Sequence, residues 1–393
     1  MDTARHADFY QTMLVEDVLP FWLDHSLDRE HGGYLTCLDR AGGVYDTDKF
    51  LWLQGRQVWT LAKMYRCVRP EPAWLEAARI GAEFVRDHGR DEAGRFYFSL
   101  DRAGRPLTRP CIFSDCFCAM GLAEYAAAAR RSSPKSADAD WARELAMETY
   151  RNIQAWMASK PDSQSRYIPD ARPMESMVYD MINVNLSLEL ASTIDDPAFR
   201  GRGLASAERI LRLFVDRGEG LVFEHVRPDG SHPDTFAGRL ITPGHALECL
   251  WFLIEAGAAW ERPDVIAAAV EAMPDVLQFG WDAEHGGLFY FMDARGKPPE
   301  RLEWDQKLWW VHGEALVAVL LAYKHTRRAE FARWFERLHD YAWGHFHDGE
   351  HGEWFGYLNR AGQVLLDLKG GKWKGCFHVP RSLWLCWKIL SEL

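Results

Sequence analysis

The stretch DREHGGYLTCLDRAGGVYD (28–46) decides the fold, because related copies of it recur along the chain. A turn containing glycine, a short aromatic and aliphatic run and a second turn of the D/N-R-x-G or P-D-G type together describe a small β-hairpin. The further copies are DEAGRFYFSLDRAGRPL (91–107), GEGLVFEHVRPDGSH (218–232), DAEHGGLFYFMDARGKPP (282–299) and DGEHGEWFGYLNRAGQVL (348–365). A repeat of this kind predicts one architecture built from equivalent units.

The copies follow one another at about 65 residues, except for one gap of double length. We therefore expect a sixth, degenerate copy in SRYIPDARP (165–173). Six units account for the whole chain and leave no room for a second domain. The sequence predicts a single domain over residues 1–393.

An apolar, helix-patterned stretch follows each hairpin. These stretches are 50–65, 112–129, 176–191, 241–257, 307–323 and 376–390, and they are apolar nearly all round, as in helices buried on both sides. A more charged, amphipathic stretch such as PAWLEAARIGAEFVRDHG (72–89) lies between each of them and the next hairpin. Six such helical hairpins predict an all-α protein, an (α/α)6 barrel with short β-hairpins at its active-site mouth. The alternative is a linear solenoid, but solenoids tend to have polar terminal repeats and the end helices here are apolar.

Composition narrows the class of protein. The formal net charge is -11 with both signs interspersed, which argues against a nucleic-acid partner. The start MDTARHADFYQTMLVEDV has no apolar signal core, and no stretch approaches the roughly 20 apolar residues that span a bilayer, so we expect a cytoplasmic protein that contacts no membrane. The eight cysteines show neither a CxxC pair nor zinc-ligand spacing, so reduced thiols and no metal site are expected. The 18 tryptophans suit a concave site where sugar rings stack.

Polar residues at the starts of the apolar helices are the candidates for chemistry, because in a ring these starts converge on one mouth. His245 follows Thr242-Pro243-Gly244 and His378 precedes Val379-Pro380, so both are expected in a first helical turn. The helix dipole there disfavours imidazolium, so each is expected to be neutral near pH 7 and available as a base. The alternative for either histidine is a purely structural role as a hydrogen-bonded residue at a helix start.

Charged partners of these histidines are expected on the same helices. Glu248 lies three residues after His245 and therefore on the same face, and Glu314 lies four after Trp310. A buried Arg56 is costly unless it meets an anion or a carbonyl oxygen, and it is expected either to stabilise an enolate oxygen or to form an ion pair with Glu248 or Glu314.

Three further patterns have weaker chemical meaning. His31, His285 and His351 belong to the recurring H-G turn and are interpreted as structural. Cys376 lies too near His378 in sequence to face it as a nucleophile pair. The glycines and lysines of LKGGKWKGCFHVP (368–380) lack the order of a P-loop, and are interpreted as a turn that lets Trp373 and Lys374 approach the pocket.

With FLWLQGRQVWT (50–60), ITPGHALECLWF (241–252), EWDQKLWWVHGEALV (303–317) and LKGGKWKGCFHVPR (368–381) in view, the chain resembles the N-acylglucosamine 2-epimerase family. The resemblance implies interconversion of N-acetylglucosamine and N-acetylmannosamine by removal and return of the C2 proton of the opened sugar. It carries catalytic positions onto His245, His378 and Glu314. The expected substrate-binding residues are Arg56, Glu248, Asn183, Asn185, Trp309, Trp310, His312, Trp373, Lys374 and Arg381.

The resemblance also implies a cofactor and a branch of the family. No cofactor is expected for the chemistry. The resemblance implies ATP as an allosteric activator for members of the N-acyl branch. The segment that resembles a nucleotide contact is reduced here to SRYIPDARPM (165–174), so ATP dependence is left open. Mannose isomerase and cellobiose epimerase relatives look to have histidine on the third inner helix, where this chain has Asn183 and Asn185. That difference favours an amino sugar as the small-molecule partner. A homodimer is compatible with the sequence.

Other functions compete with this interpretation. An aldose-ketose isomerase of the mannose/fructose type, or a 2-epimerase of a non-acetylated sugar, would use the same enediolate chemistry. A glycoside hydrolase on the same barrel would need two carboxylates, such as Glu314 with Asp305, and would leave both histidines unexplained. A pure binding protein would not need the polar residues at the helix starts.

Overall fold

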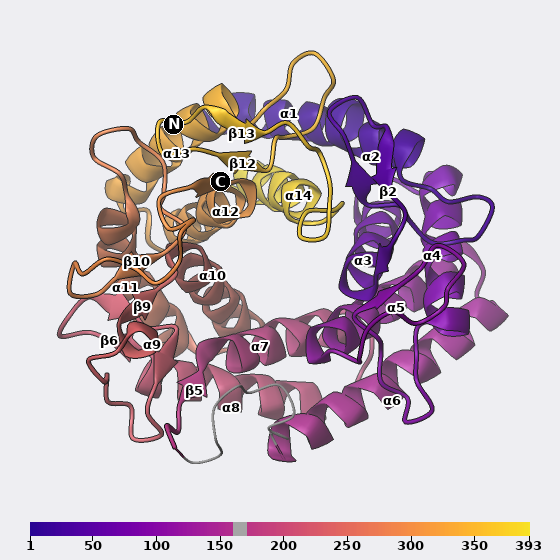
Figure 1. The fold of residues 1–393 in the computed structure, drawn as a ribbon, viewed down its shortest axis with the longest axis horizontal. Helices are drawn as coiled ribbons and strands as arrows, with labels where there is room; N and C mark the ends of the chain where they lie inside the picture. Colours follow the sequence, from indigo (N-terminus) through magenta and orange to yellow (C-terminus); the bar gives the residue numbers. More distant parts are fainter. Residues whose placement is uncertain (160–170) are drawn as a thin grey trace.

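The structure is a computed structural model in which residues 1–159 and 171–393 are described. Figure 1 shows a ring of inner helices around an open centre, with a second ring of helices outside it. The inner helices are α3 (Leu51–Cys67), α5 (Ile112–Ser132), α7 (Met177–Ala191), α10 (Pro243–Ala259), α12 (Trp309–Thr326) and α14 (His378–Ser391). The outer helices are α1 (Thr3–Thr12), η1 (Met13–Val18) and α2 (Leu19–His25), which run on from one another, α4 (Pro72–His88), α6 (Ala137–Ser159), α8 (Ala198–Leu213), α11 (Pro263–Gly280) and α13 (Ala329–His345). The predicted (α/α)6 barrel is confirmed.

Some of the short strands lie within the expected hairpins and others lie outside them. They are β1 (Cys37–Leu38), β2 (Val44–Asp46), β3 (Lys49–Phe50), β4 (Ser99–Leu100), β5 (Glu175–Ser176), β6 (Val215–Asp216), β7 (Leu221–Val222), β8 (His225–Val226), β9 (Leu240–Ile241), β10 (Met292–Asp293), β11 (Lys307–Leu308), β12 (Tyr357–Leu358) and β13 (Val364–Leu366), with a short helix α9 (Phe236–Arg239) before β9. Outside the hairpins, β3, β5, β9 and β11 directly precede inner helices, and β6 precedes the hairpin at 218–232. The expected third copy falls mostly on residues 160–170, outside the described residues.

Strand pairing joins neighbouring units. The strand just before an inner helix pairs antiparallel with the hairpin that precedes the next inner helix, as in β3 with β4, β5 with β8, β9 with β10 and β11 with β12. The hairpins that contain β4, β8, β10 and β12 are therefore each fixed by two units of the ring. This pairing holds the mouth of the barrel in a defined arrangement around the helix starts.

The ring closes between its first and last units at three levels. In the outer ring, the Tyr10 hydroxyl lies 3.1 Å from Nδ1 of His339 on α13. In the inner ring, the Thr60 hydroxyl of α3 donates to the carbonyl of Cys376 at 2.8 Å. At the mouth, Arg40 of the first hairpin binds Asp348 of the last. These contacts exclude the linear solenoid.

Inner helices pack closely where the sequence places glycine. A Cβ on Gly121 of α5 would lie 2.3 Å from the carbonyl oxygen of Gly55, and a Cβ on Gly55 would lie 2.5 Å from the backbone of Phe117. The backbones of α3 and α5 therefore touch at this point. Of the described helices, α5 alone is long and apolar enough to span a bilayer, contrary to our expectation from sequence, but 89% of its apolar window is buried inside the protein.

Buried ion pairs connect the hairpins. Asp348 receives Nζ of Lys369 at 3.1 Å and Nε of Arg40 at 2.7 Å, and the Lys369 side chain is fully buried. The same arrangement recurs as Asp28 with Lys49 and Arg102, and as Asp282 with Lys307 and Arg360. Burial lowers the pKa of Lys369 to about 8, while its partners hold the pKa of Asp348 below its ordinary value. We call each set a latch.

We predict that Asp348→Asn lowers the free energy of unfolding by about 3 kcal/mol, because it leaves the buried Lys369 ammonium without its carboxylate. Urea denaturation followed by tryptophan fluorescence measures the loss. Asp91→Asn is the matched control, since Asp91 holds the equivalent hairpin position but is partly exposed and binds the backbone N–H groups of Ala93 and Arg95. Equal losses in the two variants would contradict a special role for the latch.

Candidate functional site

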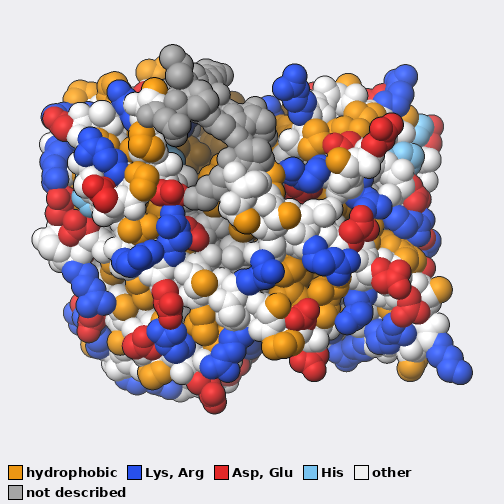
Figure 2. Space-filling model, turned by 90° about the horizontal axis from the view of Figure 1, so that it is seen from below, with side chains coloured by type: hydrophobic (Ala, Val, Ile, Leu, Met, Phe, Trp, Pro, Cys, Tyr) orange, Lys and Arg blue, Asp and Glu red, His pale blue; other side chains and the backbone are white. Residues whose placement is uncertain are grey.

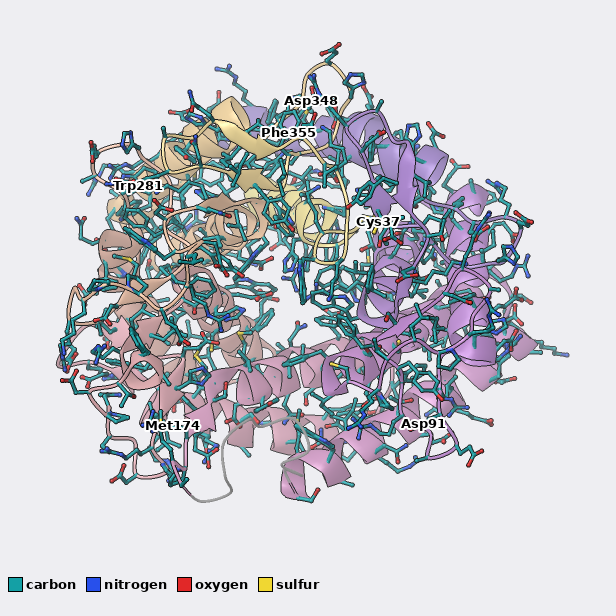
Figure 3. The ribbon with its side chains drawn as sticks, in the orientation of Figure 1. Cys37, Asp91, Met174, Trp281, Asp348 and Phe355 are labelled. Carbon is teal, nitrogen blue, oxygen red and sulfur yellow. The ribbon has the colours of Figure 1, made fainter. Side chains whose placement is uncertain are left out.

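The candidate site lies at the centre of the ring, where α10, α12 and α14 begin. Side chains of the inner helices project toward this centre in Figure 3, and the hairpin that carries Asp348 and Phe355 lies toward the outer edge of the ring in this view. Pro243 starts α10 at its first turn, which places His245 in that turn, and His378 is the first residue of α14. Both placements agree with the prediction from sequence.

His378 belongs to a buried network of charges. Its Nδ1 lies 2.7 Å from Oε1 of Glu314, and Nη2 of Arg381 donates to the same oxygen at 2.7 Å. The same Nη2 donates to Oε1 of Glu248 at 2.5 Å. The indole of Trp251 donates to the second oxygen of Glu314 at 2.9 Å. One arginine is thus shared by two buried carboxylates, and one of these carboxylates also orients the imidazole.

The surroundings of His378 favour its neutral form. Burial, together with the positive charges of Arg56 and Arg381, lowers its pKa well below the ordinary value. A neutral imidazole whose Nδ1 faces a carboxylate carries its proton on Nδ1 and leaves Nε2 as a free acceptor. His378 is therefore suited to take up a proton.

His245 has a different partner and the opposite shift. Its Nδ1 lies 3.0 and 3.1 Å from the two carboxylate oxygens of Glu224, which is buried on the hairpin between β7 and β8. Burial disfavours the charged ring, but the Glu224 carboxylate outweighs it, with help from Glu248, and raises the pKa of His245 above its ordinary value. The Glu224 carboxylate in contact with the ring thus opposes the helix-dipole effect from which we expected a neutral His245.

Glu224 was missed by the sequence analysis. The hairpin bridges place Thr36, Phe98, Glu224, Tyr290 and Gly356 at one equivalent position, two residues after the first bridge of each hairpin. Glu224 is the one acid in this set, inside an otherwise apolar run. An alignment of the five hairpins by their first turn would have identified it.

Trp310 connects the two histidines. Its ring centre lies 5.1 Å from that of His245 and 5.9 Å from that of His378. The ring centre of Trp309 lies 6.5 Å from that of His378 and 5.2 Å from that of Tyr357. The predicted tryptophans therefore do lie at the site, with Trp310 in contact with both candidate bases.

Arg56 is held by aromatic faces. Its guanidinium carbon lies 3.9 Å from the ring centre of Phe117, 4.4 Å from Trp52 and 4.8 Å from Phe377. Its Nε is buried without a hydrogen-bond partner, and burial lowers its pKa to about 9. The alternative ion pair with Glu248 or Glu314 does not form among the described contacts, since Arg381 occupies that place. Arg56 is thus a cation with unused donor capacity beside the site.

Two predicted site residues point away from the centre, and helix geometry explains both. Successive residues turn by about 100°, so residues two apart face nearly opposite sides. Because Glu314 faces the centre, His312 faces outward, where its Nε2 accepts the backbone N–H of Leu288. Likewise Asn185 faces inward, with its amide 3.7 Å from the sulfur of Met120, while Asn183 binds Gln154 and Ser206 of the outer helices. Assigning His312 and Asn183 to the substrate was wrong.

In the glycine-rich segment before His378, Trp373 lies at the mouth as predicted, but Lys374 does not. Trp373 is 53% exposed at the mouth, with its ring 5.5 Å from that of Trp52. Lys374 instead turns inward and binds Oε1 of Glu353 at 3.0 Å and the carbonyl of Lys369. The predicted contact of Lys374 with substrate was therefore wrong. A Cβ on Gly370 would lie 2.1 Å from the carbonyl of Thr36, so this glycine serves close packing.

Other candidates find no support as chemical groups. Burial raises the pKa of the Cys376 thiol well above its ordinary value, so a thiolate is disfavoured. Oxygen and nitrogen atoms of Glu248, Glu314 and His378 lie within 4.8 Å of one another, as metal ligands would, but Arg381 already supplies the positive charge between the two carboxylates. His31, His285 and His351 lie near the preceding glutamates, Glu30, Glu284 and Glu350, away from the site.

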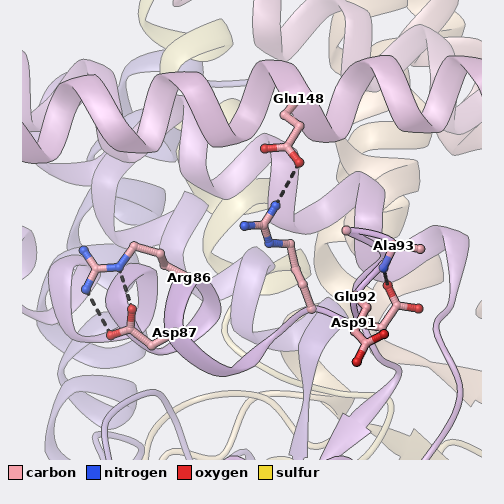
Figure 4. A pocket seen from close by; sticks show the side chains of 8 residues that line it. Arg86, Asp87, Asp91, Glu92, Ala93 and Glu148 are labelled. Carbon is pink, nitrogen blue, oxygen red and sulfur yellow. Dashed lines mark hydrogen bonds and ion pairs between the residues drawn. The ribbon is translucent and has the colours of Figure 1, made fainter.

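A recess of about 370 Å³ on the outer wall is lined by Arg86, Asp87, Arg90, Asp91, Glu92 and Glu148. In Figure 4 its arginines already face acidic partners, Arg86 with Asp87 and Arg90 with Glu148. It lies between α4 and α6, on the outer ring. Figure 2 shows the same mixture of both charges over one outer face. Both arginines of the recess are therefore already paired with acidic side chains.

Comparison with known proteins agrees with this geometry. The family described as N-acylglucosamine 2-epimerase (GlcNAc 2-epimerase) matches residues 33–380. The N-acylglucosamine 2-epimerase of Bos taurus is 42% identical, covering 96% of this chain and 90% of its own, and that of Homo sapiens is 38% identical, covering 96% and 89%. The solved cellobiose 2-epimerase of Bacillus thermoamylovorans has the same fold, with a TM-score of 0.83 over 98% of this chain and 99% of its own, at 20% identity. The chain belongs to the N-acylglucosamine 2-epimerase family.

Proposed function

We propose that the protein is a sugar 2-epimerase that interconverts N-acetyl-D-glucosamine and N-acetyl-D-mannosamine. The observation that carries this proposal is a pair of histidines that both contact Trp310 and whose surroundings shift their pKa values in opposite directions. Inversion at a carbon beside an aldehyde needs a base on one face and an acid on the other. Membership of the family supports the substrate.

The chemistry follows from these positions. Nε2 of neutral His378 takes the C2 proton of the open-chain sugar, and the electron pair of the C–H bond moves into the enolate, placing negative charge on the C1 oxygen. The unused donors of Arg56 are suited to this oxygen. Protonated His245 then gives its proton to C2 from the other face. The opposite epimer reacts by the reverse assignment of acid and base.

The remaining side chains of the site bind and orient. Glu314 fixes His378 through Nδ1, and Arg381 donates hydrogen bonds to both Glu314 and Glu248. Trp310 and Trp309 offer flat faces for the sugar, and Asn185 is a polar group on the third inner helix. Trp373 stands at the entrance. We assign these groups to substrate binding or positioning.

Two competing functions fit the site less well. A glycoside hydrolase would need Glu314 as a free acid or nucleophile, but its two oxygens are bound to His378, Arg381 and Trp251. An aldose-ketose isomerase would return the proton to C1, a route that the N-acetyl group at C2 does not favour. The 2-epimerase uses all of the arranged groups.

We further propose that one domain, residues 1–393, acts in the cytoplasm on a small amino sugar, as a homodimer, without nucleic acid, membrane or a cofactor in the chemistry. The eight cysteines are all free, which suits a reducing compartment. The exposed apolar strand β13 supports a self-association surface, since Val364, Leu365 and Leu366 are 42, 46 and 47% exposed. Activation by ATP stays open, because the relevant segment overlaps residues 160–170.

We predict that His245→Ala and His378→Ala each reduce the epimerisation of N-acetylmannosamine, with uptake of solvent deuterium at C2 of the product, by about 10²- to 10⁴-fold, the usual contribution of a general acid or base. Proton NMR in heavy water measures the exchange, with N-acetylglucosamine and mannose as further substrates. His351→Ala is the control, because His351 lies in a surface turn. Exchange with mannose alone would contradict the N-acyl assignment.

Arg56→Met is predicted to lower kcat by about 10²- to 10³-fold with a smaller change in KM, because a donor to a developing oxyanion acts mainly in the transition state. Coupled steady-state assays of epimerisation give both constants. Arg105→Met, on an exposed turn, is the control. A rise in KM with unchanged kcat would assign Arg56 to ground-state binding alone.

A further inference from the structure

The two histidines of the site have similar immediate partners. Nδ1 of His245 faces the Glu224 carboxylate at 3.0 Å, and Nδ1 of His378 faces Glu314 at 2.7 Å. In both, the contact through Nδ1 leaves Nε2 for the substrate. A carboxylate alone would favour the charged ring in both places.

The groups around each carboxylate make the two pairs different. Glu314 shares its Oε1 with Arg381, which also binds Glu248, and Arg56 lies nearby. The formal charges of these two glutamates and two arginines cancel, so a proton on His378 would leave a buried excess of positive charge. Such an excess is costly away from water.

Glu224 has no such neutralisation. Among the described residues, its recorded ion pair is with His245, and both of its oxygens face the same ring nitrogen. A proton on His245 therefore cancels a buried negative charge. The other charged or titratable groups that face His245 are Glu248 on its own helix, Arg56 on α3, His225 beside Glu224 and His378 on α14.

We propose that Glu224 is a positioning residue that keeps the resting proton of the enzyme on His245, while Arg381 keeps His378 free of it. This inference rests on the proposed epimerase chemistry but concerns the free enzyme. At rest, His378 accepts and His245 donates. After one turnover the proton lies on His378, where the arginines disfavour it, so exchange with solvent returns the enzyme to its resting form.

The sign of the pH dependence follows from this assignment. For the epimer whose C2 proton faces His378, activity rises as His378 loses its proton, below pH 6.5, and falls as His245 loses its own, above pH 6.5. Removing the charge of Glu224 lowers the pKa of His245 and moves the alkaline limb toward lower pH. The acid limb, set by His378, stays in place.

Glu224→Gln tests the proposal, since glutamine keeps the shape and removes the charge. Nitrogen-15 NMR of the His245 ring in the substrate-free enzyme is expected to show a pKa lower by about one unit or more. The alkaline limb of kcat/KM should move by the same amount, and activity above this limb should fall about tenfold for each unit moved. Glu224→Asp, which restores the charge, should return the limb toward higher pH.

Glu219→Gln is the matched control on the same hairpin, because Glu219 pairs with Arg295 at the surface, and it should leave both readouts unchanged. An unchanged His245 titration in Glu224→Gln would overturn the proposal, as would a loss of activity that is equal at every pH. The NMR titration needs no substrate, so it decides the role of Glu224 even where the epimerase assignment fails. Absence of C2 exchange in the wild-type protein would instead contradict the proposed function.

Discussion

The contact between the first and last units is the constraint on which the rest of the structure depends. Arg40 reaches Asp348 across the seam at the mouth, and Thr60 binds the carbonyl of Cys376 at the inner helices. Cys376 lies two residues before His378, so the seam fixes the start of α14. An open array of the same helices would not bring Arg56 of the first unit beside Phe377 of the last. Closure of the ring therefore assembles the site.

Charge balance explains how so many ionisable groups are tolerated inside the ring. Arg381 is buried between Trp251, Phe252 and Phe377. Its attraction to two carboxylates offsets part of the free energy needed to remove its charge from water. Burial by itself would lower its pKa, yet those carboxylates raise it. With Arg56 nearby, the two arginines balance the two carboxylates, and the proton that moves in the reaction is left to the histidines.

The sequence predicted the fold well because repetition is visible at the level of single residues. Glycines, turn residues and apolar runs recur in register, and each has a direct physical meaning for a hairpin or a buried helix. His245, His378 and Glu314 were placed correctly at helix starts for the same reason. Residues whose role depends on the direction of a side chain were harder, since His312 and Asn183 lie within two residues of true inward positions.

The ion pairs of the latches could not be predicted from the sequence of any single repeat unit. Asp28, Lys49 and Arg102 come from a turn, a strand and the following hairpin, and no local pattern says that they meet. The same is true of Glu224 and His245, which lie in different elements 21 residues apart. Such contacts depend on how neighbouring units are stacked, and only the closed ring specifies that stacking.

Charged groups at the two ends of the barrel differ in whether they already have partners. At the ends of the inner helices opposite to the mouth, Lys63 binds Glu124 at 2.8 Å and Glu189 at 3.0 Å, and the indole of Trp59 donates to Glu189. These charges satisfy one another and raise the pKa of Lys63 above its ordinary value, which fixes its charge. At the mouth, Arg56 keeps unused donors and His245 is 30% exposed. Arg56 therefore keeps free donors at the mouth, whereas ion pairs satisfy the charged groups at the opposite ends of the same helices.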